Sequence, residues 1–267
     1  AEQRYESYVK TQEREFVLQA QDAIPEAEFG QTLRTVYGGV SMTLPANRIN
    51  DLLELDGVVA VQADELRAPL TDSSIDFIGA DTLYSQLGGD TDAGKGTTIG
   101  VLDTGVWPEH PSFADLGNMD PWPGPELPCE FGDNPLTEEY DPFECQNKLV
   151  GGWTFLDTYH NQVGDEQFPG TARDDNGHGT HTMGTAAGNA LESAPVMGAD
   201  HGPLQGVAPG AWVIMYRVCG PQGCYSSDSA QAVAQAVQDG VDVINFSISG
   251  GTSPFTDPVE LAFLDAY

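Results

Sequence analysis

Three short segments of the sequence carry residue types that could do chemistry. In the first, an apolar run over residues 99–102 ends at Asp103, and Thr104 and Gly105 follow. If the run is a buried strand, the carboxylate lies at its carboxyl end, where sites form in open parallel sheets. There it could act in acid–base chemistry, held by backbone N–H groups. The alternative is an Asp that only shapes the turn.

The second segment runs from Asp174 to His181 and reads DDNGHGTH, followed by the small residues of 182–188. Small residues at helical spacing predict a tightly packed helix with His178 at its N-terminus. Glycines on both sides of that imidazole leave room for another group to approach. The alternatives are a structural histidine, or zinc held by His178 and His181. Against zinc, no Glu stands at metalloprotease spacing and no third ligand is evident.

The third segment, residues 245–251, reads NFSISGG after the apolar run VDVI. A buried strand that ends in small residues could offer its edge to an extended peptide. The alternative is an ordinary strand followed by a glycine turn.

The elements that would position these segments alternate between strand and helix. We expect strands over 97–102, 212–218 and 241–248, and a helix over 226–239 that ends at Gly240. In that helix the predicted buried face contains Ala230, Val233, Ala234 and Val237. Strands alternating with helices predict an α/β fold with a parallel sheet.

The first 70 residues have a different pattern, of α+β type. The expected order is a helix over 1–23, strand–turn–strand over 33–44, a helix over 45–55, a strand over 58–61 and an extended segment over 64–70. One further strand ahead of Ala1 would complete a small split-βαβ, ferredoxin-like domain, and we expect that this strand is missing from the sequence.

Composition excludes several classes of protein. The 267 residues include 41 acidic and 10 basic ones, a formal net charge of −31, which disfavours nucleic acid and anionic membranes as partners. No apolar stretch approaches the roughly 18 to 20 residues of a membrane helix. The chain begins without a signal peptide, which leaves open that it starts after one. The charge fits a solubilising surface, or a salt-adapted or calcium-rich setting.

The four cysteines form two local pairs, Cys129 with Cys145 and Cys219 with Cys224. Close pairs in even number fit disulfides in an oxidising compartment, although four unpaired thiols are the alternative. The first disulfide would pin a long excursion over residues 117–148, and closing its loop stabilises a fold by about 3 kcal/mol in the chain-entropy description.

Together the segments resemble the subtilisin family of serine proteases over nearly the whole chain. Asp-Thr-Gly, His-Gly-Thr-His and the Ser-x-x-Gly strand end stand in that family's order. Residues 106–113 (VWPEHPSF), 217–228 and 254–258 look like its plant-type and related bacterial branch. The resemblance implies a secreted endopeptidase that acts on proteins and peptides and requires no cofactor. Structural calcium stays open, although an EF-hand loop from Asp90 fails because Val101 stands at its closing Glu position.

The resemblance also assigns roles to residues. It makes Asp103 the triad acid, which orients the imidazole, and His178 the general base. The helix N-terminus opposes the imidazolium by about 0.3 to 1 kcal/mol, whereas the charge-assisted bond to Asp103 contributes about 1.5 to 3 kcal/mol. The carboxylate therefore dominates.

A substrate peptide would pair with Ser247, Ile248, Ser249 and Gly250. Ser249 stands where the family more often has Gly, so the resemblance does not extend to the neighbouring specificity pocket.

The resemblance further divides the chain into an inhibitory propeptide over 1–70 and the N-terminal part of a peptidase domain over 71–267, with self-cleavage between Leu70 and Thr71. The propeptide would act as an intramolecular inhibitor. The family's oxyanion Asn and nucleophilic Ser have no match here. Gly251-Thr252-Ser253 imitates the Ser motif but directly follows the substrate strand, so we expect both residues beyond Tyr267.

Loss of the nucleophile costs about 10⁶-fold in subtilisin itself, so the 267 residues alone are expected to be inactive. The competing hypothesis is a non-catalytic chain that ends at Tyr267 and binds peptides or inhibits a protease.

Overall fold

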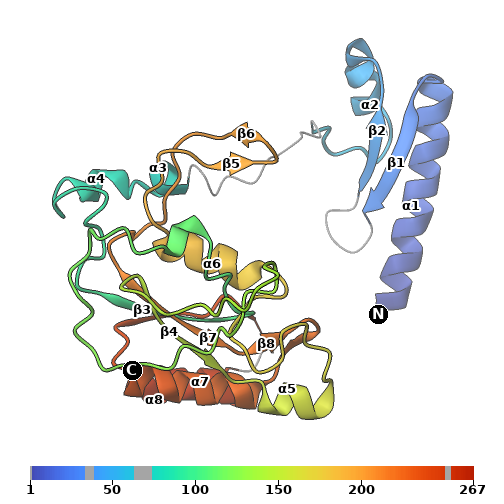
Figure 1. Ribbon diagram of the computed structural model, residues 1–267. Helices are drawn as coiled ribbons and strands as arrows, with labels where there is room; N and C mark the ends of the chain where they lie inside the picture. Colours follow the sequence, from blue (N-terminus) through green and yellow to red (C-terminus); the bar gives the residue numbers. More distant parts are fainter. Residues whose placement is uncertain (1, 34–38, 63–73, 250–253) are drawn as a thin grey trace. The chain divides into compact units, whose positions relative to one another are not determined.

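The computed structural model describes residues 2–33, 39–62, 74–249 and 254–267 (Figure 1). The chain divides into two compact units, Ala1–Ala68 and Pro69–Tyr267. Each unit has its own buried apolar core.

The smaller unit packs helices against a two-stranded antiparallel sheet. Its elements are α1 (Glu2–Ala23), β1 (Glu28–Leu33), β2 (Gly39–Thr43), the 3₁₀ turn η1 (Ala46–Arg48) and α2 (Ile49–Leu53). Ala20 near the end of α1, Ile24 just after it and Leu52 of α2 are buried together against Phe29 and Met42 of the sheet. The last turns of a long charged helix therefore contribute to this small core together with the sheet and α2.

Two predictions in this unit need correction. The first strand begins at Glu28, earlier than expected, and the predicted strand over 58–61 is absent. The side chain of Val59 is 97% exposed and the segment pairs with neither β1 nor β2, so nothing holds it in a strand. The predicted extended segment over 64–70 lies outside the described residues.

The larger unit contains the parallel sheet that the sequence predicts. The strand order is β10 (Val243–Asn245), β3 (Thr98–Asp103), β7 (Trp212–Arg217) and β4 (Leu149–Thr154). Strand β4 was not predicted. Strand β10 is much shorter than the expected 241–248, because it lies at the edge of the described sheet and pairs with β3 only over its three residues.

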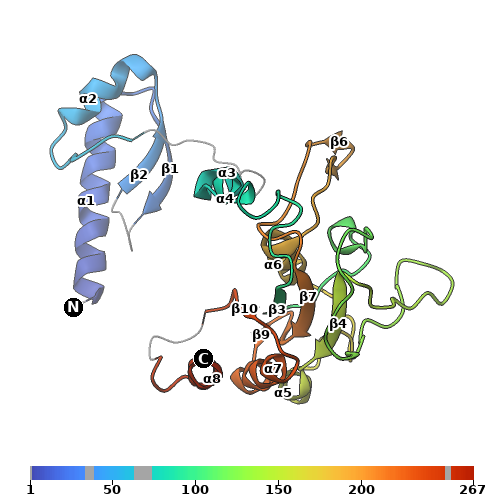
Figure 2. The same cartoon turned by 90° about the vertical axis from the view of Figure 1, so that its left-hand side faces the viewer.

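Helices cover both faces of this sheet (Figures 1 and 2). Helix α6 (His178–Ala187) lies on one face, and α7 (Ser226–Gln238) and α8 (Pro258–Ala266) lie on the other. Val101 and Met215 pack on the side of α6, whereas Leu102 and Ile214 pack on the side of α7. This alternation is the period of two that a strand buried on both faces must have.

The buried face of α7 differs from the predicted one. Ala232, Val233 and Ala236 are buried, while Ala234 and Val237 are exposed. The predicted stripe therefore shared Val233 but was rotated around the helix, because the sequence does not show which side meets the sheet.

Short elements and two disulfides complete the unit. The disulfides join Cys129 to Cys145 and Cys219 to Cys224, as the spacing predicts. The first closes a loop within the largely irregular 117–148 excursion. The remaining elements are α3 (Ser74–Ile78), α4 (Asp81–Tyr84), η2 (Pro111–Phe113), α5 (Asp157–Gln162), β5 (Pro195–Val196), β6 (Ala199–Asp200), β8 (Cys219–Gly220) and β9 (Gly223–Cys224).

Within the described ranges, no helix is long and apolar enough to cross a membrane.

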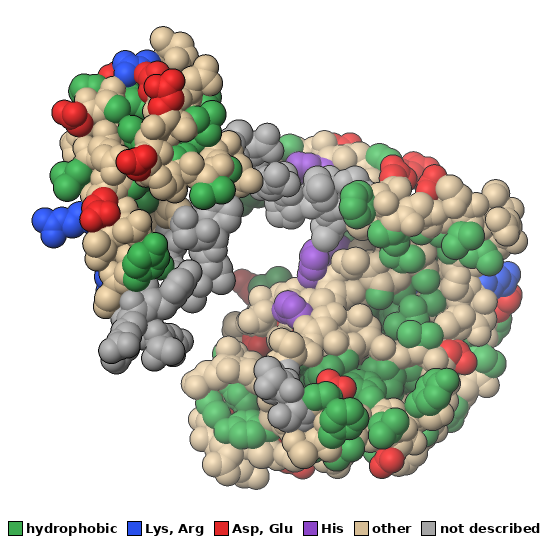
Figure 3. Space-filling model, turned by 180° about the vertical axis from the view of Figure 1, so that it is seen from behind, with side chains coloured by type: hydrophobic (Ala, Val, Ile, Leu, Met, Phe, Trp, Pro, Cys, Tyr) green, Lys and Arg blue, Asp and Glu red, His purple; other side chains and the backbone are tan. Residues whose placement is uncertain are grey.

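Negative charge is concentrated on the larger unit. It contains 29 acidic and four basic residues, and three of the four cations, Lys148, Arg173 and Arg217, are buried. Lys95 is then the one exposed Lys or Arg in the described part of this unit. Acidic side chains are scattered over the face drawn in Figure 3, and Lys and Arg are few there. The surface charges therefore repel one another with little compensation.

We expect NaCl to raise the melting temperature of the chain by several degrees. Between about 10 mM and about 1 M salt the screening length falls from about 30 Å to about 3 Å, which weakens the repulsion in the folded state. Scanning calorimetry measures the shift. Replacing the exposed Glu138 and Glu139 by Lys removes two negative charges and adds two positive ones, and should therefore reduce the salt response. An equal response in this variant would contradict the explanation.

Lys148 is buried without a carboxylate partner among the described residues. Its Nζ donates to the carbonyl oxygens of Pro209 and Ala211, each at 2.7 Å. Burial disfavours the ammonium and lowers the pKa of Lys148 from 10.5 to about 7. A neutral amine still has two N–H groups for the two carbonyls.

This burial predicts a pH dependence of stability. Between pH 7 and 10.5 the unfolded Lys148 binds a proton that the folded one has released, so the free energy of unfolding should rise with pH across this window. Urea unfolding of the wild type and of Lys148→Met at several pH values checks it. The free energy of unfolding of the wild type should rise relative to that of Lys148→Met as pH rises. If the two free energies changed with pH in parallel, the burial of Lys148 would not be the cause.

Candidate active site

Asp103 and His178 meet where strand β3 ends and helix α6 begins. Strand alternation puts Asp103 on the same face of the sheet as Ile99 and Val101, which is the face that α6 covers. His178 is the first residue of that helix. Its Nδ1 lies 2.7 Å from Oδ1 of Asp103, although 75 residues separate the two in the chain.

The two side chains have opposite environments. The carboxylate of Asp103 is fully buried, whereas the imidazole of His178 is 48% exposed. Oδ1 of Asp103 also accepts the backbone N–H of Thr104 at 2.7 Å, and Oδ2 accepts the hydroxyl of Thr182 at 3.1 Å. A buried, hydrogen-bonded carboxylate therefore contacts Nδ1 of an imidazole that is about half-exposed.

Two glycines allow this close approach. Gly105 has φ +115°, and a Cβ there would lie 2.6 Å from the carbonyl oxygen of Arg173. A Cβ on Gly179 would lie 2.1 Å from the carbonyl oxygen of Gly105. Backbone thus packs directly on backbone at the start of α6, and the Gly179 N–H donates to Thr104 Oγ1 at 2.9 Å. The sequence prediction of room around His178 concerned Gly177 and Gly179, and of these two Gly179 makes the close backbone contact.

Asp174 fixes the start of the helix. Its Oδ1 accepts the N–H groups of Asn176 and Gly177, and its Oδ2 accepts the N–H and hydroxyl of Thr180. Thr104 also donates to Oδ1, at 2.9 Å, which ties the end of β3 to the start of the helix. Burial opposes ionisation, but the bonds from Thr180 and the backbone amides outweigh it and lower the pKa of Asp174. Gly177 occupies the N-cap position and has no side chain, so the Asp174 carboxylate satisfies N–H groups at the helix start from three residues earlier, a role that the sequence analysis missed.

Buried arginines hold the loop that leads into the helix. Arg217, at the end of β7, contacts Asp175 at 2.7 Å and donates to the carbonyls of Phe168 and Thr171. Burial lowers the pKa of Arg217, and the charge of Asp175 opposes this shift. Arg173 makes two bonds to the carboxylate of Glu109, at 2.7 and 2.9 Å. None of these roles was predicted, because nothing local in the sequence shows which cations are buried.

His181 takes no part in the pair. It lies on α6 beside a separate cavity of about 450 Å³. That cavity is lined by residues from α6, from the 174–177 loop before it, from the 107–113 loop and from the 204–206 segment. In the described part of the chain, no group of three or more His, Cys, Asp or Glu side chains could hold a metal ion. His178 and His181 therefore have no further protein ligand there to complete a zinc site.

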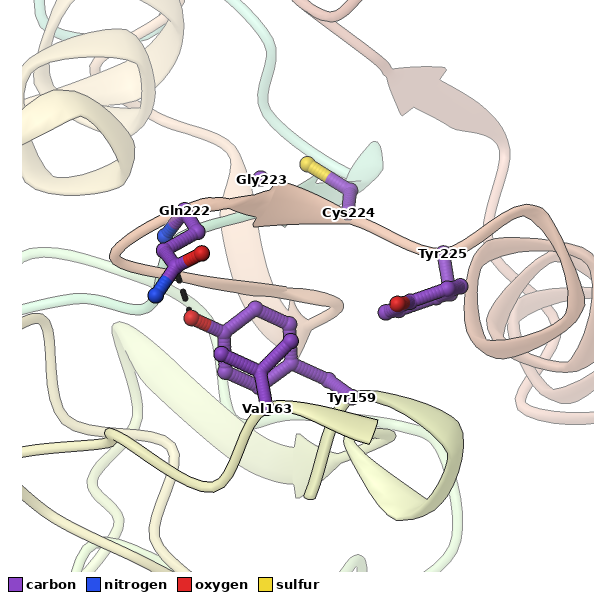
Figure 4. A pocket seen from close by; sticks show the side chains of 6 residues that line it. All are labelled: Tyr159, Val163, Gln222, Gly223, Cys224 and Tyr225. Atoms are coloured by element: carbon purple, nitrogen blue, oxygen red, sulfur yellow. Dashed lines mark hydrogen bonds between the residues drawn. The ribbon is translucent and has the colours of Figure 1, made fainter. Parts of the chain in front are cut away.

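A second, smaller cavity of about 200 Å³ lies between α5 and the β8–β9 hairpin (Figure 4). Tyr159 and Tyr225 contribute its rings, and the Gln222 N–H donates to the Tyr159 hydroxyl at 3.0 Å. Val163, Gly223 and Cys224 complete the lining. Neither Asp103 nor His178 lines this cavity.

The predicted peptide-binding residues follow the end of β10. Ser247 and Ser249 are exposed and Ile248 is half-buried, in an irregular segment. Ser247 contacts Asn245 through its hydroxyl, at 3.0 Å from Nδ2. Gly250, like Leu70 and Thr71 of the predicted cleavage junction and the Gly251-Thr252-Ser253 imitation, lies outside the described residues.

Comparison with known proteins gives consistent matches. The profile of the family described as "Subtilase family" matches residues 94–263. Subtilisin-like protease SBT1.2 of Arabidopsis thaliana is 35% identical over 91% of this chain and 32% of its own length, and SBT1.5 is 37% identical over 84% and 29%. The chain spans about a third of the length of these relatives. The nisin leader peptidase NisP from Lactococcus lactis is a structural match at TM-score 0.39 and 27% identity, covering 65% of this chain and 40% of its own.

The close packing at Gly179 predicts a position-specific effect of alanine. We expect Gly179→Ala to reduce the free energy of unfolding by about 1 to 3 kcal/mol, because its Cβ meets backbone and overpacks the site. Gly184→Ala in the same helix is the control, since its nearest neighbour would be a Phe113 ring atom at 4.0 Å. That substitution should be neutral or stabilising, and urea unfolding measures both. Equal effects at the two positions would contradict the packing argument.

Proposed function

This chain belongs to the subtilase family, and from that premise we propose that the protein it comes from is a serine endopeptidase. The observation that carries the proposal is the 2.7 Å contact between buried Asp103 and half-exposed His178. An ionised carboxylate can only accept, so Nδ1 of His178 carries the proton and Nε2 is left free as a base.

The proposed mechanism gives each group one task. Nε2 of His178 removes the proton of a serine hydroxyl as that oxygen attacks the peptide carbonyl, and later returns a proton to the leaving amine. Asp103 keeps the imidazole in the required tautomer and stabilises the imidazolium. As the sequence analysis expects, the serine and the oxyanion-hole donor are proposed to lie beyond Tyr267. Substrate would align along Ser247, Ile248, Ser249 and Gly250, giving the backbone bonds that hold an extended peptide.

We further propose that residues 1–70 are an inhibitory propeptide cut between Leu70 and Thr71. The separate compact unit Ala1–Ala68, with its own core, is the observation that supports this division. Secretion is proposed with it, since two disulfides suit an oxidising compartment. Protein or peptide substrates and the propeptide itself are the proposed partners.

The triad roles predict large losses of activity in the whole protein. Asp103→Asn should lower kcat by about 10⁴-fold through the wrong imidazole tautomer, and His178→Ala should lower it at least as much. Hydrolysis of a chromogenic peptide measures kcat, and His201→Ala, at an exposed position that follows β6 and contacts neither Asp103 nor His178, is the matched control. Near wild-type hydrolysis by either site variant would reject the assignment.

A further inference from the structure

The hydroxyl of Thr182 faces two acceptors at the same distance. Its Oγ1 lies 3.1 Å from Oδ2 of Asp103 and 3.1 Å from the carbonyl oxygen of Gly179, one helical turn back. A hydroxyl has one proton, so it serves these acceptors in competition. A threonine within a helix ordinarily bonds to a carbonyl of the preceding turn. The second acceptor is what distinguishes Thr182.

The Asp103 carboxylate is the stronger of the two acceptors for the Thr182 hydroxyl. Its Oδ1 already accepts from Thr104 N–H and faces His178, each at 2.7 Å. Among the described residues, Thr182 is the one donor recorded for Oδ2, and the carboxylate is shielded from solvent. An ionised carboxylate is a stronger acceptor than a neutral carbonyl, and a buried unsatisfied oxygen is costly. The competition therefore favours Asp103.

We propose that Thr182 is a positioning residue for the acid–base pair. Its hydroxyl donates to Oδ2 of Asp103 and so fixes the carboxylate plane with Oδ1 toward His178. The same hydrogen bond stabilises the negative charge of the carboxylate and weakens its attraction for the imidazolium. The catalytic part of this inference rests on the proposed peptidase function. The hydrogen-bonding part rests only on the contacts of Asp103.

Loss of the hydroxyl changes the basicity of His178 in a defined direction. Without the donor, the carboxylate is less stabilised and attracts the imidazolium more strongly, so the pKa of His178 rises. The other charged groups nearby are Asp174, which reaches the site through Thr104, and the pair of Arg217 with Asp175. Substitution at Thr182 leaves all of them in place.

The direct test is an NMR titration of the His178 ring in the 267-residue chain. Thr182→Val keeps the branched shape and removes the hydroxyl, so the pKa of His178 should rise by about half a unit. Thr182→Ser restores the hydroxyl and should return the pKa to the wild-type value. A pKa that is unchanged or lower in Thr182→Val would overturn the proposal. If Thr182→Val does not fold, Thr182→Ala is titrated in its place with the same expected rise.

Kinetics of the whole protein separates positioning from structure. Thr182→Val should lower kcat on the order of tenfold with little change in KM, and move the acidic limb of the kcat/KM profile to higher pH. Thr182→Ser should restore both. A residue that served only packing would not move the pH profile, and that result would also overturn the proposal.

The two experiments distinguish this inference from the proposed function. If the whole protein hydrolyses no peptide, the peptidase proposal fails, while the titration of His178 still tests the Thr182 contact. If Asp103→Asn abolishes hydrolysis but Thr182→Val changes neither the titration nor kcat, the Thr182 inference alone fails.

Discussion

The rest of the site depends on one packing constraint, the contact of backbone with backbone where α6 starts against the end of β3. Gly179 lies against the carbonyl of Gly105, and no side chain separates the helix from the strand end. Asp103 is aimed by the strand and His178 by the helix, so their 2.7 Å contact follows once these two elements touch. Two hydrogen bonds then connect the end of the strand to the start of the helix: the Thr104 hydroxyl donates to Asp174, and the Gly179 N–H donates to the Thr104 hydroxyl oxygen. The fold thus brings the imidazole within hydrogen-bond distance of the carboxylate.

Most of the larger unit's few cations serve the interior. Arg217 joins the end of β7 to the loop before α6, and Arg173 joins that loop to Glu109. Lys148 ties the start of β4 to the turn before β7 through two carbonyls. Such buried cations order irregular segments that have no ladder of their own, but each must be matched by acceptors. Because these three cations are buried, they leave the acidic side chains on the surface with few positive neighbours.

The sequence predicted the parts of the fold that have a strong local signal. The buried runs of β3 and β7, the small-residue helix α6 and the capped end of α7 were all expected, and the family and its α/β fold are confirmed. Strand β4 was missed because Gly151 and Gly152 break its apolar pattern. The strand over 58–61 was wrong because strand-forming residues do not form a strand without a partner.

At the site, the sequence linked Asp103 to His178 only through the order of the family's motifs. The two residues are 75 positions apart, and no local sequence pattern predicts a contact over that separation. Thr182 and Asp174 could not be ranked from sequence for the same reason. Their roles come from which oxygen each faces, and that is a property of the packed joint. The sequence therefore indicated Asp103 and His178 but not the surrounding residues, such as Thr182 and Asp174, that hydrogen-bond around them.

The distribution of lysine has a practical consequence for anyone who wishes to label or immobilise this chain. Amine-reactive dyes and resins couple to unprotonated, accessible amines. The chain has three lysines, and Lys148 is buried. Lys10 lies in the smaller unit, which leaves Lys95, with half of its side chain exposed, as the lysine handle of the larger one. A fluorophore or a bead attached by this chemistry would therefore sit at one defined place on the larger unit, before strand β3, without any engineered cysteine.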